Sequence, residues 1–240
     1  MGTDLRTSEL WVASLGTVPY AEAVDVQERL RARRQADEIP DTLLLLEHPA
    51  VYTRGRRSDA ADLPLGDAWY EAQGIEVLDT DRGGRVTYHG PGQLVGYPIM
   101  RVPDVIGFVR TMEQALVTAL ADEGVAAESR HRLTGVWTAQ GKIASIGIHV
   151  ARRVSTHGFA VNVDTDLEPF RWIVPCGIEG VAMTSIAEIT GRAGGLACFR
   201  RRVGWRFAQA YGRRQRLVTL DRLLGGAPIP QGERLESALV

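Results

Sequence analysis

The chain has 240 residues, of which 45% are hydrophobic and 24% are charged, and its 28 basic and 29 acidic side chains nearly cancel. This composition is typical of a folded globular protein and excludes a disordered chain, a collagen-like repeat and a disulfide-stapled miniprotein. The near-zero net charge gives no sign of nucleic-acid binding. No apolar run reaches the roughly 18 residues of a membrane span, and residues 1–6 do not resemble a signal peptide, so we expect no membrane insertion.

The first half of the chain alternates short apolar runs with polar stretches. A charged segment over 20–38 predicts a helix. The segment 54–66 is polar and contains Gly and Pro, which predicts an exposed loop. The apolar runs predict strands over 10–15, 43–46, 75–78, 86–88 and 94–99, and the second of these is apolar enough to be buried on both faces.

The second half begins with the clearest helix signal. Between Asp104 and Gly124, apolar residues recur every three or four positions, and Asp104 is a suitable N-cap. Two strands are expected over 142–150 and 156–163, joined by a polar turn. A further helix is marked by Phe199, Val203, Phe207 and Tyr211, and a last strand by 217–220. Because these signals alternate without a break in composition, we expect one mixed α/β domain followed by a C-terminal tail.

Two cysteines, Cys176 and Cys198, are too few for a disulfide framework, so we expect free thiols and a cytoplasmic protein. Cys198 lies in a helical pattern, and we expect it to be a buried, inert side chain. Cys176 lies between Pro175 and Gly177 in a loop, which makes it the better candidate for a nucleophile. A catalytic thiol needs a neighbouring base or cation to form the thiolate.

Lysine and arginine are used very unequally. Of the 28 basic residues, one, Lys142, is lysine and the other 27 are arginine. Arginine keeps its proton, whereas a partly desolvated lysine can release it. Lys142 is therefore one candidate partner for a catalytic thiol and His89 is another, although a single lysine in an arginine-rich chain also arises by chance.

Glycines are concentrated in the segment Arg82-Gly83-Gly84-Arg85-Val86-Thr87-Tyr88-His89-Gly90-Pro91-Gly92-Gln93. Glycine permits close backbone approach to a ligand, but two tight hairpin turns would explain the same pattern. The segment matches neither of the common phosphate-binding loops. A second group, Ser145-Ile146-Gly147 and His157-Gly158-Phe159-Ala160, lies on two predicted strands. Small residues there leave a slot for a thin apolar ligand, or they allow a helix to pack closely, which is the commoner reason.

Four segments taken together resemble the lipoyl(octanoyl) transferase family, octanoyl-[acyl-carrier-protein]:protein N-octanoyltransferases. They occur in the order of the family and span about residues 40–190 with their surroundings. The segments are Arg82 to Gln93, Gly141 to Gly147, His157 to Ala160 and Pro175 to Ile178.

The resemblance implies an α/β (α+β) fold, a mixed sheet flanked by helices, similar to the catalytic domain of biotin and lipoate protein ligases. From the sequence pattern we expect a single catalytic domain over 1–225 and a flexible tail over 226–240. The implied activity is transfer of an octanoyl or lipoyl group from acyl carrier protein to a lysine of lipoyl domains, the first step of endogenous protein lipoylation. No cofactor and no metal are implied.

The resemblance also assigns residues. Cys176 would carry the acyl group as a thioester, and Lys142 would lower the pKa of Cys176, so that the two form a Cys-Lys dyad. His89 is expected to shape the acyl slot. The implied substrate-binding residues are Arg82, Gly83, Gly84, Arg85, Val86, Thr87, Tyr88, His89, Ser145, Ile146, Gly147, Gly158, Phe159 and Ala160.

The implied partners are octanoyl-acyl carrier protein, the lipoyl domains of 2-oxoacid dehydrogenase complexes and the glycine cleavage H protein. These proteins are expected to be acidic, so we expect basic residues around the entrance to the site. The candidates are Arg54, Arg56, Arg57, Arg200, Arg201 and Arg202. Two alternatives stay open: an ATP-dependent lipoate or biotin ligase on the same scaffold, and a non-catalytic acyl-binding protein.

Overall fold

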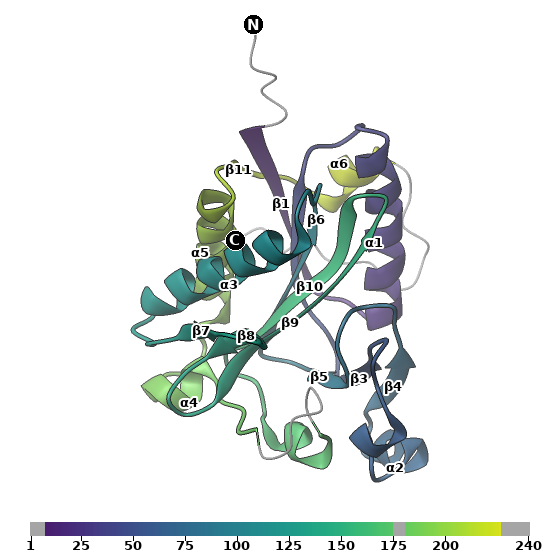
Figure 1. Ribbon diagram of the computed structural model, residues 1–240, viewed down its shortest axis with the longest axis vertical. Helices are drawn as coiled ribbons and strands as arrows, with labels where there is room; N and C mark the ends of the chain where they lie inside the picture. The colour runs from purple at the N-terminus through teal and green to yellow at the C-terminus, as the bar shows by residue number, and fades with distance from the viewer. Residues whose placement is uncertain (1–7, 175–180, 227–240) are drawn as a thin grey trace, which may run out of the picture.

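The computed structural model describes residues 8–174 and 181–226 (Figure 1). Cys176 and all but the first residue of the predicted tail lie outside the described residues. The main sheet has eight strands in the order β11-β1-β2-β6-β10-β9-β8-β7. They are β1 (Glu9–Thr17), β2 (Thr42–Glu47), β6 (Gln93–Ile99), β7 (Glu128–Arg130), β8 (Leu133–Trp137), β9 (Lys142–Ala151), β10 (Val154–Asn162) and β11 (Arg214–Leu217).

The sheet is mixed, because β1 pairs in parallel with β2 and β11 while the remaining neighbours are antiparallel. The side chains of β2 alternate between two hydrophobic clusters. Leu43 and Leu45 belong to one cluster, and Leu44 and Leu46 belong to the other. All four are at most 1% exposed, which confirms the prediction of a strand buried on both faces.

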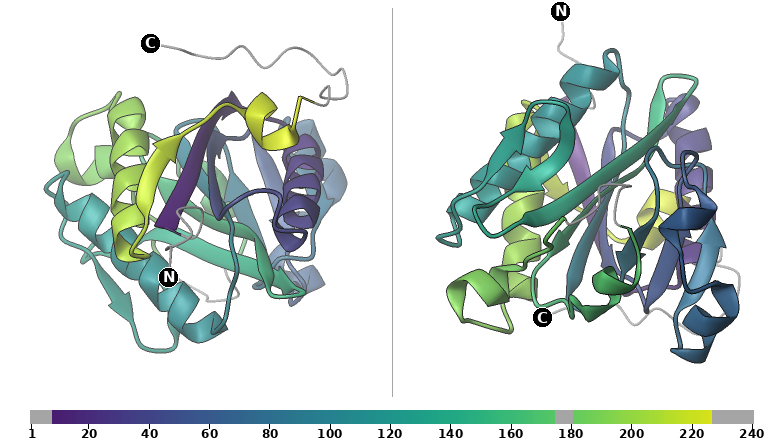
Figure 2. Two further views of the ribbon diagram at one scale, coloured as in Figure 1. Left: turned by 90° about the horizontal axis from the view of Figure 1, so that it is seen from above. Right: turned by 60° about the horizontal axis from the view of Figure 1, so that its bottom comes forward.

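Helices cover both faces of this sheet. The helices α3 (Val105–Ala121) and α5 (Leu196–Ala210) pack on the Leu43 side, and α1 (Tyr20–Gln35) and α6 (Leu220–Leu224) pack on the Leu44 side. Figure 2 shows α1 and α5 on opposite sides of the strands. This arrangement confirms the predicted α/β class with a mixed sheet flanked by helices. None of the described helices is both long and apolar enough to cross a membrane.

A smaller sheet lies beside the main one, at the lower right of Figure 1. Its strands have the order β4-β3-β5. An aromatic cluster that includes Tyr52, Tyr70, Tyr88 and Phe170 packs here. The strands of this sheet are β3 (Val51–Arg54), β4 (Glu76–Asp79) and β5 (Thr87–His89). The remaining described helices are α2 (Asp67–Ala72), α4 (Ile186–Thr190) and the 3-10 helices Ala60–Asp62 and Glu168–Trp172.

Two expectations about local structure need correction. The segment 54–66 is not entirely an exposed loop, because it contains a 3-10 turn whose Asp62 is 1% exposed and pairs with Arg85 at 2.9 Å. The last strand ends at Leu217 instead of continuing to Leu220. Thr219 accepts a hydrogen bond from the backbone of Arg222 and so caps α6 at the point where a strand was predicted.

The expectation that Cys198 is buried is wrong. Its side chain is exposed on α5. The buried stripe of this helix runs through Phe199, Val203 and Phe207. Cys198 precedes Phe199 by one position, and this rotates its side chain by about 100° away from the stripe.

Candidate active site

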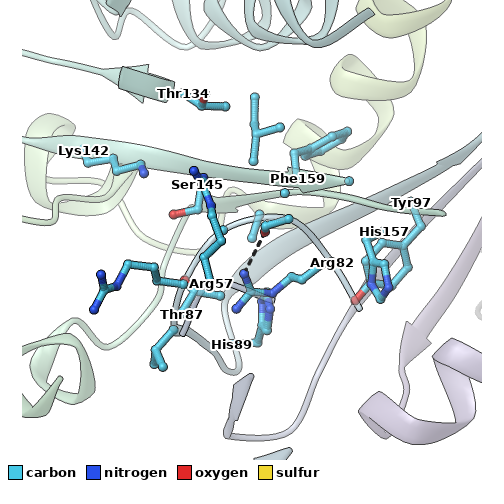
Figure 3. Close-up of a pocket in the computed structure, with 18 of the residues that line it drawn as sticks. Arg57, Arg82, Thr87, His89, Tyr97, Thr134, Lys142, Ser145, His157 and Phe159 are labelled. Atoms are coloured by element: carbon cyan, nitrogen blue, oxygen red, sulfur yellow. Dashed lines mark hydrogen bonds between the residues drawn. The ribbon is translucent and has the colours of Figure 1, made fainter. Parts of the chain in front are cut away.

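A pocket of about 300 Å³ is lined by the two glycine-containing groups of the sequence (Figure 3). Thirteen of the fourteen predicted substrate-binding residues line it, together with Lys142. The exception is Tyr88, which packs against Tyr52 and Phe170 on the other side of β5. Successive residues of a strand face opposite sides, so Thr87 and His89 reach the pocket while Tyr88 does not.

Close backbone approach explains Gly83 and its neighbour Gly147 on β9, whereas Gly84 adopts a φ of +97°. The N–H of Gly83 donates to the carbonyl of Ile148 on β9 at 3.0 Å. A Cβ atom built on Gly147 would lie 2.5 Å from the carbonyl oxygen of Gly83, which no real side chain tolerates. The segment 82–84 therefore lies against β9, and a hairpin turn does not explain Gly83.

The small residues of β9 and β10 form part of the pocket wall, as the slot interpretation predicted. Gly158 meets a further constraint, because a Cβ atom there would lie 2.1 Å from the carbonyl oxygen of Gly96 on the neighbouring strand β6. Phe159 projects over the same glycine, whose own Cβ would overlap the ring. Glycine at 158 on β10 and at 96 on β6 therefore lets these two strands and the Phe159 ring pack closely in the pocket wall.

Lys142 begins β9 and is 2% exposed. Its N–H donates to the carbonyl of Ala182 at 2.8 Å, and its carbonyl accepts from the N–H of Thr184 at 3.0 Å. A Cβ on Gly141 would lie 2.3 Å from the Ala182 carbonyl oxygen, which explains the glycine before the lysine. The Nζ atom lies 5.4 Å from the centroid of the Trp137 ring. The single lysine of the chain is therefore a buried, positioned residue of the pocket wall.

His89 is joined to Lys142 by a chain of hydrogen bonds. Its Nδ1 donates to Oε1 of Gln93 at 2.7 Å, and Nε2 of Gln93 donates to Oδ1 of Asn162 at 2.9 Å. The side-chain amide of Asn162 donates in turn to the carbonyl of Thr184. The backbone N–H of Thr184 donates to the carbonyl of Lys142. Burial, followed by the nearby charges of His48 and Arg82, holds the pKa of His89 well below its usual range. His89 is neutral and fixed in one orientation, which fits a role in shaping the pocket.

The other end of the pocket carries polar side chains to which the sequence assigned no role, although His157 lies in one of the four segments. Figure 3 shows His157 and Tyr97 at the opposite end from Lys142. Nε2 of His157 lies 2.6 Å from Oδ1 of Asp81, and the Tyr97 hydroxyl lies 2.6 Å from Nε2 of His48. Tyr20 also lines this end. These residues are far apart in sequence, and only the fold brings them together.

The expectation about basic residues at the entrance is only partly correct. Arg54 pairs with Asp67, Arg200 with Glu47, and Arg202 with Glu123. Arg56 and Arg201 are exposed but do not line the pocket. Of the six candidates only Arg57 lines it, and Arg132, which the sequence did not indicate, lines it too. Both are exposed and have no carboxylate partner among residues 8–174 and 181–226.

The buried histidines predict acid sensitivity. Burial lowers the pKa of His48 to about 4 from its ordinary 6.5, so between these values the unfolded chain binds a proton that the folded protein does not. The burial of neutral His48 therefore makes its full contribution to the free energy of unfolding above pH 6.5. This contribution falls by about 3 kcal/mol as the pH drops to about 4. The lowered pKa values of His89 and His157 act in the same direction.

We therefore expect the free energy of unfolding, measured in denaturant from pH 7 to pH 4.5, to fall less steeply with decreasing pH in His48→Gln than in the natural protein. The variant is less stable at pH 7, because the bonds to Tyr97 and Val18 are weakened. His131→Gln changes an exposed histidine and serves as the control. Equal slopes in His48→Gln and the natural protein would contradict the assignment.

Comparison with known proteins adds to this geometry. Residues 19–208 match the family model of the lipoyl protein ligase A/B catalytic domain. The octanoyltransferase of Solibacter usitatus is 49% identical over 75% of this chain and 83% of its own length. That of Syntrophotalea carbinolica is 47% identical over 82% of this chain and 92% of its own length.

Solved structures agree on the fold. A lipoate-protein ligase A bound with ATP superimposes with a TM-score of 0.72 at 17% identity, covering 90% of this chain and 93% of that one. Ta0514, a putative lipoate protein ligase from T. acidophilum, gives a TM-score of 0.71 at 16% identity, covering 90% and 92%. These identities establish the architecture alone, while the closer sequence matches decide the family. The chain belongs to the lipoyl protein ligase A/B catalytic-domain family, and within it to the octanoyltransferases.

Proposed function

We propose that this octanoyltransferase moves an octanoyl or lipoyl group from acyl carrier protein to a lysine of lipoyl domains, through a thioester on Cys176. The observation that carries the proposal is the buried side chain of Lys142 in the wall of the pocket, in a chain that is 45–49% identical to three octanoyltransferases over 75–82% of its length. The pocket volume of about 300 Å³ is in the range that holds small ligands.

The reaction is proposed to run in two steps. The Cys176 thiolate, stabilised by the protonated amine of Lys142, attacks the carbonyl of the octanoyl thioester. The bond between the acyl carbon and the phosphopantetheine sulfur breaks, that sulfur takes the proton of Lys142 and leaves as a thiol, and the acyl group stays on Cys176. The amine of the acceptor lysine then attacks the new thioester, the Cys176 sulfur leaves, and Lys142 accepts the proton released by the amine. Exchange of a thioester for an amide is downhill, so the scheme needs no ATP.

The acceptors are proposed to be the lipoyl domains of 2-oxoacid dehydrogenase complexes and the glycine cleavage H protein. A related archaeal lipoate ligase has been solved in a study with its E2 lipoyl domain, at 17% identity and a TM-score of 0.70. We place the protein in the cytoplasm, where its thiols stay reduced. Residues 1–225 are proposed as the catalytic domain and 226–240 as a tail.

The two catalytic assignments are tested by Cys176→Ser and Lys142→Arg. Incubation with octanoyl carrier protein should give the natural protein a hydroxylamine-sensitive octanoyl adduct in intact mass spectrometry, and Cys176→Ser should give none. Lys142→Arg keeps a cation but cannot accept a proton, so we expect it to lose at least about 100-fold in transfer to a lipoyl domain.

The same variants separate the alternatives. An ATP-dependent ligase has no need of the thiol, so full activity in Cys176→Ser would favour that class. An acyl-binding protein without turnover would form no adduct in the natural sequence. Cys198→Ser is the matched control, because this exposed thiol lies on α5 and should be dispensable.

We propose that Arg57 and Arg132 face the acidic partners or the phosphate of the carrier arm. Both line the pocket, both are exposed, and neither has a carboxylate partner in the described parts of the chain. Exposed charges of this kind contribute mainly to encounter and lose their effect at high salt.

The double variant Arg57→Gln/Arg132→Gln should raise KM for octanoyl carrier protein roughly three- to tenfold at low salt and leave octanoyl-pantetheine, which has no phosphate and no protein, unaffected. High salt should remove the difference between the variant and the natural protein. Arg201→Gln, an exposed change away from the pocket, is the control. Equal losses with both donors would show a distorted pocket instead of a lost contact.

A further inference from the structure

Glu113 is a carboxylate with no exposed surface, on the sheet-facing side of α3 among Met112, Ala115 and Leu116. A buried carboxylate is unfavourable unless both of its oxygens have partners. Oε2 lies 2.6 Å from Nη1 of Arg110, one helical turn away. Oε1 accepts a hydrogen bond of 3.0 Å from the backbone N–H of Gly135 on β8.

Gly135 is placed directly against the side chain of Lys142. A Cβ atom built on Gly135 would lie 2.7 Å from Cε and 3.4 Å from Nζ of Lys142, and 2.5 Å from the carbonyl oxygen of Ala144. The φ angle of +124° at Gly135 also favours glycine. The backbone at this position is therefore the surface on which the end of the lysine side chain lies.

Strand β8 is irregular at this point. Its pairing with β7 shifts register here, because Val136 pairs with Ser129 and Leu133 pairs with Arg130, which leaves Thr134 and Gly135 as extra residues of β8. Towards β9, Val136 pairs with Ala144 and Trp137 pairs with Lys142. In this register Gly135 is paired with no residue of the neighbouring strands β7 and β9. A bulge of this kind leaves a backbone group without its usual partner in the sheet. Glu113 supplies the acceptor from the helix below.

We infer that Glu113 is a positioning residue for Lys142: its carboxylate fixes the bulge at Gly135, and the bulge fixes the lysine amine in the pocket. The inference rests on the proposed function, in which Lys142 moves a proton. Misplacing a reacting group by about 1 Å is enough to cost about 100-fold in rate. The effect of Glu113 should therefore be seen in the rate of the bound complex and not in substrate affinity.

The test compares variants that separate the hydrogen bond from the charge. Glu113→Gln keeps an acceptor oxygen at the same reach, whereas Glu113→Met fills the same space without one. At saturating octanoyl carrier protein we expect Glu113→Gln to form the acyl-enzyme within about threefold of the natural rate. Glu113→Met should be roughly 10- to 100-fold slower, with KM little changed. Arg110→Gln removes the outer partner only and should behave like Glu113→Gln.

A purely structural role predicts different results. It would lower the melting temperature of Glu113→Met and leave kcat per folded molecule unchanged, and that outcome overturns the inference. Equal losses in Glu113→Gln and Glu113→Met also overturn it, because the charge and not the bond would then be needed. If Glu113→Met does not fold, Glu113→Asp takes its place. It keeps the charge but is one methylene too short to reach Gly135, and the same loss is expected.

A double variant shows whether the effect passes through the lysine. Glu113→Met added to Lys142→Ala should cost no further rate if Glu113 acts by positioning Lys142, whereas independent effects would multiply. Full activity of Lys142→Ala alone would remove the proposed proton-transfer role of Lys142, on which the inference rests. An inactive Lys142→Ala beside a fully active Glu113→Met would overturn the positioning role and leave the proposed function intact.

Discussion

The pocket depends on backbone contact between the segment 82–84 and strand β9, where Gly83 meets Gly147 and Ile148. Gly83 donates to Ile148 on β9, and Gly147 leaves room for the Gly83 carbonyl. A side chain at Gly147 would push the segment 82–84 away from β9, because its Cβ would lie 2.5 Å from the Gly83 carbonyl oxygen. The contact also places Arg82, whose guanidinium donates to the side-chain and backbone oxygens of Thr53, inside the pocket. The Arg82 guanidinium is thus held at a fixed point of the pocket wall.

Lys142 is held from two directions. Its backbone is bonded to the segment 182–184, which Asn162 and Gln93 connect to the ring of His89. Its side chain lies against the Gly135 backbone on β8. Buried networks of hydrogen bonds specify one arrangement when every member is paired. The amine is therefore positioned before any substrate arrives, as efficient proton transfer requires.

Much of the fold could be predicted because its elements carry local signals. The apolar run of β2 and the Asp104 cap of α3 marked their elements correctly. The glycine-containing segments marked the pocket wall. Glu113 gave no signal, since its burial depends on the N–H of Gly135, which a bulge in strand β8 leaves without a partner in the sheet. Tyr20 and His157 lie 137 positions apart in the chain, so no spacing rule could connect them.

The polar residues at the far end of the pocket also bear on what it can hold. The His48 ring is occupied at both nitrogens, by the carbonyl of Val18 and the hydroxyl of Tyr97. His157 bonds to Asp81, and burial lowers its pKa. Because these groups satisfy one another and the histidines stay neutral, they have little need of hydrogen bonds from a ligand. These groups therefore lose few hydrogen bonds when a hydrocarbon chain lies against them. The polar composition of this end of the pocket is compatible with an acyl chain.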